Sequence, residues 1–249
     1  MLAAILGQLL AWELTLKTLS ALSRRAARAY VERRVSWMAT RLFAIVRYYG
    51  RLRVDLDPGL VHDVPSPVVF CANHQSVADI VVLLASLPNH GLRFVAKKEL
   101  SRGFPAVSEV LRLGGHALID RTGDYRTVVG RLERLGRDVD AGRSPVVFAE
   151  GTRSRDGAVR PFHPGGIRTI LAGRTTPIAA VAVDGGYRIV TMKDLAKRMN
   201  TVTYRAKLVG VFAHDGSKRG IQTAVESAHD AIVDQIHTWR SETQKDRVK

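Results

Sequence analysis

The sequence predicts an α/β fold in which helices flank a mostly parallel mixed sheet, with a helical segment at the N-terminus. The chain has 249 residues, a length that suits one large domain with a short appendage. Apolar residues make up 46% of it, which is enough for a buried core and too many for a disordered chain. Beyond about residue 50, short β-rich apolar runs alternate with helical segments. Such alternation is typical of a largely parallel sheet covered on both faces.

The strands are expected where apolar residues alternate or form short runs bounded by polar residues. At 51–57 the alternation of Leu52, Val54 and Leu56 indicates the first strand, and the Asp-Pro-Gly sequence at 57–59 is typical of a turn. Further strands are expected at 67–72, 92–96, 117–119, 145–148, 178–183 and 202–212.

The helices are expected where apolar residues recur at a period of three to four. Beyond the first 22 residues they are expected at 30–49, 80–87, 104–113, 125–139, 167–171 and 220–239. The sequence contains no internal repeat and no Pro/Gly-rich linker. The expected division is therefore a helical segment at 1–50 and an α/β domain at 51–249.

The N-terminal segment has the pattern of an interfacial membrane anchor. Residues 1–12 are uncharged, and leucines such as Leu2, Leu6 and Leu9 recur at helical spacing. Glu13 and Lys17 interrupt the run before the ~20 apolar residues that a spanning helix needs, so no segment plainly qualifies as one. Nine arginines and one acid follow between residues 24 and 53. An apolar helix that leads into a basic cluster suits an anionic lipid surface, so this is a membrane-associating segment; packing on the protein's own core or on a second subunit is the alternative.

The charge and the cysteine content limit the class of protein. The formal net charge of +15 favours polyanionic partners, such as anionic lipids, phosphorylated substrates or nucleic acid. The single cysteine, Cys71, excludes an intramolecular disulfide and a Cys-rich zinc site. We therefore expect a protein on the cytoplasmic face of a membrane, peripheral or monotopic.

His74 and Asp79 are the candidate catalytic residues. They follow the strand expected at 67–72, and ligands of open α/β sheets gather at the carboxyl ends of strands. Asn73 or Ser76 can cap the next helix, and Asp79 in its first turn can reach back to His74. This pairing would orient the imidazole and stabilise it once it has taken a proton. The alternative is that His74 caps the helix and Asp79 is an ordinary first-turn acid.

Basic residues follow three other strands. Lys97 and Lys98 come after the strand at 92–96, and Arg121 comes after the strand at 117–119. The strand at 145–148 leads into Ala-Glu-Gly-Thr-Arg-Ser-Arg at 149–155, where Gly permits close approach and Thr and Arg can hold phosphate oxygens. Together these residues describe a catalytic base beside an anion pocket.

These segments resemble the 1-acyl-glycerol-3-phosphate (lysophosphatidic acid) acyltransferases of the glycerolipid acyltransferase superfamily. The family's Asn-His, four residues, Asp motif is matched by Asn73, His74 and Asp79. Its Gly to Ile-Asp-Arg motif is matched at 115–121, and its Phe-Pro-Glu-Gly-Thr-Arg-Ser motif at 148–154 with Ala149 in place of proline. An apolar strand with an early proline, at 176–183, resembles the fourth motif.

The resemblance implies an acyltransferase that needs no cofactor. It implies that His74 acts as general base, oriented by Asp79, on the acceptor hydroxyl. The hydroxyl then attacks the thioester of acyl-CoA or acyl carrier protein. The residues implied to hold the glycerol-phosphate end are Glu150, Gly151, Thr152, Arg153 and Arg121, with Lys97 nearby. Glu150 is a poor phosphate ligand, so we expect it to bond a hydroxyl or to position Arg153.

Other readings of the sequence are weaker. No nucleophile elbow follows a strand, and no P-loop spacing occurs. His62, Asp63 and His163 lack partners at metal-ligand spacing, and Cys71 lies in an apolar strand. The acceptor can be another lysophospholipid or an amino-acid-derived lysolipid. The alternative from a different class is a basic nucleic-acid-binding protein, but aromatics total only 6% and no binding motif occurs, so we expect no nucleic acid partner.

Overall fold

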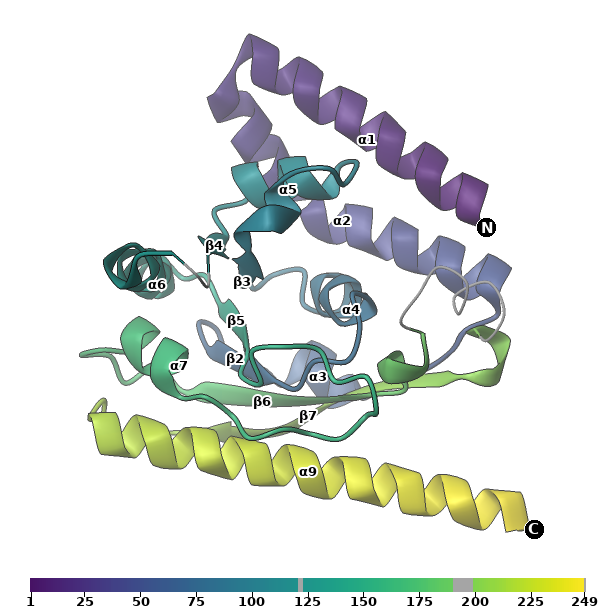
Figure 1. The fold of residues 1–249 in the computed structure, drawn as a ribbon, viewed down its shortest axis with the longest axis vertical. Helices are drawn as coiled ribbons and strands as arrows, with labels where there is room; N and C mark the ends of the chain where they lie inside the picture. Colours follow the sequence, from purple (N-terminus) through teal and green to yellow (C-terminus); the bar gives the residue numbers. More distant parts are fainter. Residues whose placement is uncertain (121–122, 190–198, 249) are drawn as a thin grey trace.

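A computed structural model describes residues 1–120, 123–189 and 199–248 of the chain. Seven strands form one sheet in the order β1-β7-β6-β2-β5-β3-β4 (Figure 1). The strands are β1 (Arg53–Leu56), β2 (Val69–Ala72), β3 (Arg93–Lys97), β4 (Ala117–Ile119), β5 (Pro145–Phe148), β6 (Ile178–Asp184) and β7 (Thr203–Phe212). All neighbouring pairs are parallel except β6 and β7, which are antiparallel. The predicted mostly parallel mixed sheet is confirmed.

The helices flank this sheet as expected, although several bounds differ. They are α1 (Leu2–Leu22), α2 (Arg24–Gly50), α3 (Pro58–His62), α4 (Ala78–Ser86), α5 (Val107–Leu113), α6 (Tyr125–Asp140), α7 (Gly165–Ile170) and α9 (Lys218–Val248). The second helix begins earlier than predicted because the Ser23 hydroxyl accepts the amide of Ala26 at 3.2 Å and caps it. The turn predicted at 57–59 is wrong, since Pro58 opens the short helix α3.

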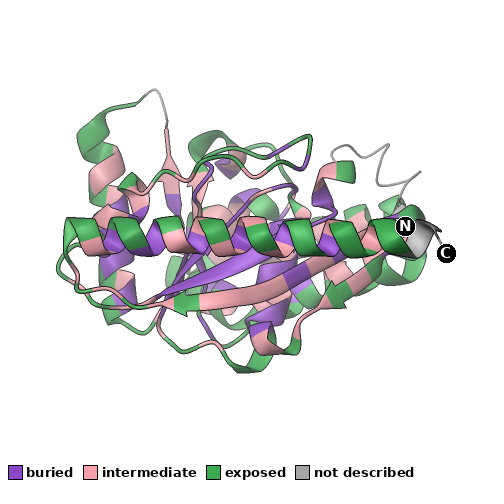
Figure 2. Ribbon diagram, turned by 90° about the horizontal axis from the view of Figure 1, so that it is seen from below, coloured by how far each residue is buried: buried purple, intermediate pink, exposed green. Residues whose placement is uncertain are grey.

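Alternate residues of the central strands face two different cores. Phe70 and Ala72 of β2 point to the side covered by α2 and α4, where Leu83 is fully buried. Val69 and Cys71 point to the other side, which α6, α7 and α9 cover. Figure 2 shows α9 lying across the sheet with exposed residues along its outer side. Because both faces are covered, the central strands are apolar throughout, as the sequence predicted.

The N-terminal hairpin of α1 and α2 packs on α5 through a third, smaller core. Trp12 and Leu16 of α1 are buried there against Val31 of α2 and Leu113 of α5. By length and composition α1 is long and apolar enough to cross a membrane, with 11% of its apolar window buried in the protein. Glu13 and Lys17, which interrupt the apolar run, pair at 2.5 Å within one continuous helix.

Candidate active site

The carboxyl ends of β2 and β5 bring two of the predicted segments together at one edge of the sheet. These strands are parallel neighbours, with Ala72 level with Phe148. His74 follows β2 and Glu150 follows β5. β7 runs antiparallel to β6, so its first residues, including Tyr204, begin at the same edge. Three elements far apart in the sequence therefore supply side chains to one place.

His74 and Asp79 form the predicted pair. The imidazole Nδ1 lies 2.7 Å from Asp79 Oδ2, with the His74 side chain 15% exposed and the Asp79 side chain fully buried. The same carboxylate oxygen accepts the backbone amides of Gln75 at 2.7 Å and Ser76 at 2.9 Å. The other oxygen, Oδ1, accepts the hydroxyl of Tyr204 at 2.8 Å. Four donors therefore stabilise the carboxylate in its charged form within the protein interior.

This arrangement decides which nitrogen of His74 can act as a base. With Nδ1–H donating to Asp79, Nε2 carries the free lone pair. The imidazole also stacks on Phe148 at the end of β5, with ring centroids 3.9 Å apart and planes 14° apart. The imidazole ring is thus fixed by the hydrogen bond from Nδ1 to Asp79 and by stacking of one face on the Phe148 ring.

Glu150 holds the backbone of His74. Its Oε1 accepts the His74 amide at 2.8 Å, and its Oε2 accepts the Arg160 amide at 3.0 Å. The His74 carbonyl in turn accepts the amide of Ser154 at 2.7 Å. Burial raises the pKa of Glu150, against the opposing effect of the two amide bonds. Both carboxylate oxygens therefore accept backbone amides, a role that the sequence analysis did not assign, and the expectation that Glu150 bonds a hydroxyl or positions Arg153 stays a prediction.

The turn at 148–151, which has Ala149 where the related motif has proline, is held by backbone hydrogen bonds. Ala149 donates its amide to Ala72 at 3.3 Å, a bond that proline cannot make, and its carbonyl accepts the amide of His163 at 2.8 Å. Gly151 has φ of 72°, and its amide bonds Phe148 at 3.0 Å. These hydrogen bonds hold the turn, and Gly151 supplies the left-handed residue that it needs.

The predicted anion-binding residues are open to solvent beside this turn. Gly151, Thr152 and Arg153 are exposed. They follow Glu150 directly in the loop that is hydrogen-bonded to His74. Lys97, the last residue of β3, is exposed at the same edge of the sheet. Arg121 lies outside the described residues.

The predicted capping of α4 is only partly right. Asn73 does not cap the helix: its side chain exchanges two hydrogen bonds with the backbone of Val183, at 2.9 and 2.8 Å, and so extends the pairing of β2 with β6. The Ser76 hydroxyl accepts the amide of Ala78, the first residue of α4, at 3.3 Å.

A buried polar chain that the sequence analysis missed links the loop after His74 to the C-terminal helix. Gln75 donates to Asp184 at 3.1 Å and accepts the amide of Tyr187 at 3.3 Å. Asp184 also accepts Arg240 of α9 at 2.8 Å, a contact that raises the pKa of the Arg240 guanidinium. The only sequence signal for these hydrogen bonds was Asp184, an acidic residue at the end of an otherwise apolar strand.

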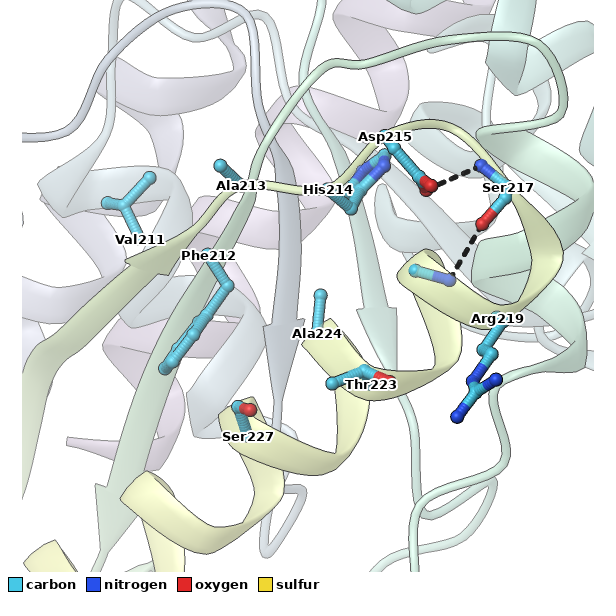
Figure 3. Close-up of a pocket in the computed structure, with 11 residues that line it drawn as sticks. Val211, Phe212, Ala213, His214, Asp215, Ser217, Arg219, Thr223, Ala224 and Ser227 are labelled. Atoms are coloured by element: carbon cyan, nitrogen blue, oxygen red, sulfur yellow. Dashed lines mark hydrogen bonds between the residues drawn. The ribbon is translucent and has the colours of Figure 1, made fainter.

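The hollow drawn in Figure 3 is a different feature. It lies between the end of β7 and the start of α9, where Phe212 pairs with Ile178, the first residue of β6. The Ser217 amide donates to the Asp215 carboxylate, and the Ser217 hydroxyl accepts the amide of Gly220, each at 2.9 Å. The second bond caps α9. This hollow is at the opposite edge of the sheet from His74. Within residues 1–120, 123–189 and 199–248, no three His, Cys, Asp or Glu side chains are grouped to hold a metal ion.

The fold and this edge together define an α/β protein with a histidine–aspartate pair beside a cationic loop, an arrangement suited to general-base chemistry on an anionic substrate. A model of the acyltransferase family matches residues 60–184, which contain the pair and the loop. The chain belongs to the acyltransferase family.

Individual relatives agree with this assignment. The chain is 28% identical over 168 residues to the 1-acyl-sn-glycerol-3-phosphate acyltransferase of Cocos nucifera, covering 68% of this chain and 53% of the relative. It is 34% identical over 98 residues to the lyso-ornithine lipid O-acyltransferase of Pseudomonas aeruginosa, covering 39% and 35%. The chain thus spans about half the length, or less, of these curated relatives. The crystal structure of the 1-acyl-sn-glycerophosphate acyltransferase PlsC of Thermotoga maritima shares the fold, with a TM-score of 0.63 at 21% identity over 92% of this chain and 95% of that one.

Proposed function

We propose that the protein transfers a fatty acyl group from acyl-CoA or acyl carrier protein to the free hydroxyl of 1-acyl-glycerol-3-phosphate, giving phosphatidic acid. The observation that carries the proposal is the 2.7 Å contact between His74 Nδ1 and the buried carboxylate of Asp79. That contact leaves Nε2 as the base, and the names of several relatives supply the substrate class. The family assignment favours this activity over the nucleic-acid-binding alternative.

The geometry of the pair supports a general-base reaction. Nε2 of His74 takes the proton of the acceptor hydroxyl as the oxygen attacks the thioester carbonyl. The carbon–sulfur bond then breaks, and the leaving thiolate takes the proton from the imidazolium, so the enzyme returns to its starting state. Asp79 stabilises the imidazolium between these steps. General-base catalysis of this kind contributes about 10²–10⁴-fold, and holding both substrates in place contributes further.

The acceptor's phosphate is assigned to the exposed cationic loop. Arg153 and Thr152 offer donors to phosphate oxygens, and Gly151 lets the backbone come close. Lys97 and Arg121 are proposed to complete this set. Glu150 fixes the loop against His74, so the base and the phosphate site are held at a fixed position relative to each other.

The substrate and the product are lipids, and we propose that α1 brings the site to a membrane surface. Exposed leucines on α1 lie four residues apart, at Leu2, Leu6, Leu10 and Leu14. Exposed arginines follow on α2, including Arg24, Arg25 and Arg28. An apolar stripe beside positive charge suits the cytoplasmic face of an anionic bilayer.

A second acceptor is favoured by one specific observation. The relative from Pseudomonas aeruginosa is named for acylation of a lyso-ornithine lipid. The same base can act on the hydroxyl of that amino-acid-derived lysolipid, but its headgroup carries no phosphate. Acceptor choice would then depend on whether Arg153 requires a phosphate as its partner.

A substrate panel tests both candidates. The full chain is offered labelled acyl-CoA or acyl carrier protein with lysophosphatidic acid, lyso-ornithine lipid or another lysophospholipid, and release of free thiol is followed. We expect thiol release that depends on lysophosphatidic acid, lost in His74→Ala and retained in His237→Ala, a control on the exposed side of α9. Preference for the lyso-ornithine lipid would overturn the substrate, and a fully active His74→Ala protein would overturn the mechanism.

A further inference from the structure

A cavity rich in arginine lies between α2, α5, α6 and the start of β4. Its volume is about 550 Å³, within the ~300–1,000 Å³ range of small-molecule sites. Six arginines line it: Arg28, Arg93, Arg112, Arg131, Arg134 and Arg143. None of these residues belongs to the site around His74.

The acids in the cavity neutralise only part of this charge. Glu32 accepts Arg93 at 2.5 Å and Arg143 at 3.3 Å, and Asp138 lies 3.6 Å from Arg143. Among the described residues no carboxylate pairs with Arg28 or Arg134. The lining therefore keeps a net positive charge, and two of its guanidinium groups are available to an anion.

The floor of the cavity contains an unsatisfied donor. Arg93 is 5% exposed, and its Nε is buried with no hydrogen-bond partner in the described structure. Gly115 lies beside it with φ of 73°, and a Cβ at that position would come within 3.0 Å of the Nε. A side chain at position 115 would therefore press on the Arg93 guanidinium, whose buried Nε has no hydrogen-bond partner to compensate its desolvation.

His116 adds a neutral donor to the same lining. Its Nδ1 accepts the amide of Phe94 at 3.1 Å, so the proton of the neutral ring lies on Nε2. Burial and the neighbouring charge of Arg93 lower the pKa of His116 to about 3. The ring is therefore uncharged near neutral pH and contributes a hydrogen bond but no charge.

The position of the cavity separates it from the catalytic edge and relates it to the membrane-facing helix. Arg93 is the first residue of β3, whereas Lys97 is the last, so the cavity lies at the opposite end of the strands from His74. The helices α2 and α5, which line it, also pack against α1 (Figure 1). Their shared core includes Leu16 of α1 and Leu113 of α5.

We propose that this cavity binds the phosphate group of an anionic phospholipid headgroup, outside the active site. Guanidinium groups are the preferred partners of phosphate oxygens, and this cavity presents several of them around a buried unpaired donor. The choice of a lipid source rests on the proposed contact of α1 with a membrane; soluble phosphate compounds share the chemistry. Occupation would hold the hairpin of α1 and α2 in a fixed position on the lipid surface.

The test uses the full chain and measures binding, with no acyl transfer involved. The probes are a short-chain phosphatidic acid below its micelle concentration, inorganic phosphate, and 3′,5′-adenosine bisphosphate, each followed by calorimetry. The double variant Arg28→Gln/Arg134→Gln removes two exposed cavity charges. The matched control Arg33→Gln/Arg34→Gln removes two exposed charges from α2 at residues that do not line the cavity. Arg153→Ala, which removes the side chain assigned to the acceptor's phosphate in the active site, is measured in parallel.

We expect the lipid to bind and the cavity variant to weaken it by at least about tenfold, with the control and Arg153→Ala close to the original protein. Loss of binding in Arg153→Ala with binding kept in the cavity variant would locate the lipid in the active site and overturn the proposal. Equal weakening by the two double variants, or no saturable binding, would show that the lipid is attracted only by diffuse surface charge. Either result would also overturn the proposal. Tighter binding of 3′,5′-adenosine bisphosphate would keep the phosphate site and replace the lipid by a soluble ligand.

Discussion

The buried carboxylate of Glu150 accepts a hydrogen bond of 2.8 Å from the backbone amide of His74. The same two segments are joined again where Ser154 donates to the His74 carbonyl at 2.7 Å. Both backbone groups of the histidine are therefore held by the loop that follows β5. Since that loop also carries Arg153, any shift of the loop moves the base and the cationic group together.

Glu150→Gln should lower acyl transfer and change how stability depends on pH. The two amides that Glu150 accepts each need an oxygen, and glutamine offers one oxygen and an NH₂ group that would face an N–H. We expect a loss of about 1–3 kcal/mol of stability at neutral pH and a fall in kcat. Chemical denaturation and single-turnover rates of the two proteins measure these effects.

The pH dependence of stability separates the effect of ionising the Glu150 carboxyl group from the effect of losing its hydrogen bond. Because burial raises the pKa of Glu150, the folded state binds its proton more tightly than the unfolded chain does. The stability of the original protein relative to Glu150→Gln should thus be greatest below the ordinary glutamate pKa. It should fall as the pH rises through the raised value and then level off. A difference that stays flat from pH 4 to pH 8, or grows with pH, would contradict this assignment.

Tyr204→Phe should weaken catalysis without removing it. The hydroxyl of Tyr204 donates to Asp79 at 2.8 Å, and burial, with the charge of Asp79 next in importance, raises the tyrosine pKa well above its usual range. The hydroxyl therefore stays protonated and remains a donor. Without this hydroxyl, the Asp79 carboxylate has one hydrogen-bond donor fewer, so its negative charge should stabilise the His74 imidazolium more strongly. We expect a lower kcat and a shift of the acidic limb of the pH–rate profile to higher pH.

The matched control for this change is Tyr125→Phe, which removes a hydroxyl from a side chain that is 78% exposed. Its rate and pH profile should equal those of the original protein. A Tyr204→Phe protein with reduced stability but an unmoved pH profile would assign the hydroxyl to folding alone.

Most of the sheet and the central pair were predictable because their signals are local. Short apolar runs bounded by turn residues marked every strand, and β4 and β5 match the expected bounds. Asp79 lies in the first turn of α4, five residues after His74, so the short loop between β2 and α4 brings them together. The predicted turn at 57–59 failed because proline also starts helices, and α3 packs Leu60 into the core.

The partners of the pair were not predictable because they depend on contacts distant in sequence. Tyr204 follows Asp79 by 125 positions, and Arg240 follows Asp184 by 56. The sheet order, with β7 beside β6, brings Tyr204 to the edge that carries His74, and the packing of α9 on β6 brings Arg240 to Asp184. The role of Glu150 was missed for a related reason, since a motif shows which residues are present but not which backbone amides they accept.

Arg153→Ala should raise the KM for the lysolipid acceptor more than the KM for the thioester donor. The side chain is exposed beside the loop that holds His74, where a charge-assisted bond to phosphate is worth about 1.5–3 kcal/mol, or roughly 10–100-fold in affinity. Steady-state kinetics with each substrate varied in turn measure the two constants. Arg219→Ala, an exposed arginine in the hollow of Figure 3, is the control and should leave both unchanged. Equal increases in the two KM values would remove the phosphate-binding role from Arg153.

Leu10→Gln/Leu14→Gln should release the protein from lipid vesicles while leaving its fold intact. These side chains are 49% and 69% exposed on α1, so the substitutions remove no buried contact from the core of the hairpin. Burying a leucine side chain in an apolar phase contributes about 1.5–3 kcal/mol, so the loss of two should weaken vesicle affinity by at least about a hundredfold. Co-sedimentation with vesicles containing anionic lipid measures the affinity, and thermal unfolding checks the fold. The control Val61→Gln/Val211→Gln changes two exposed valines on α3 and β7 and should sediment like the original protein. Unchanged sedimentation of the leucine variant would transfer the membrane contact from α1 to the arginines of α2.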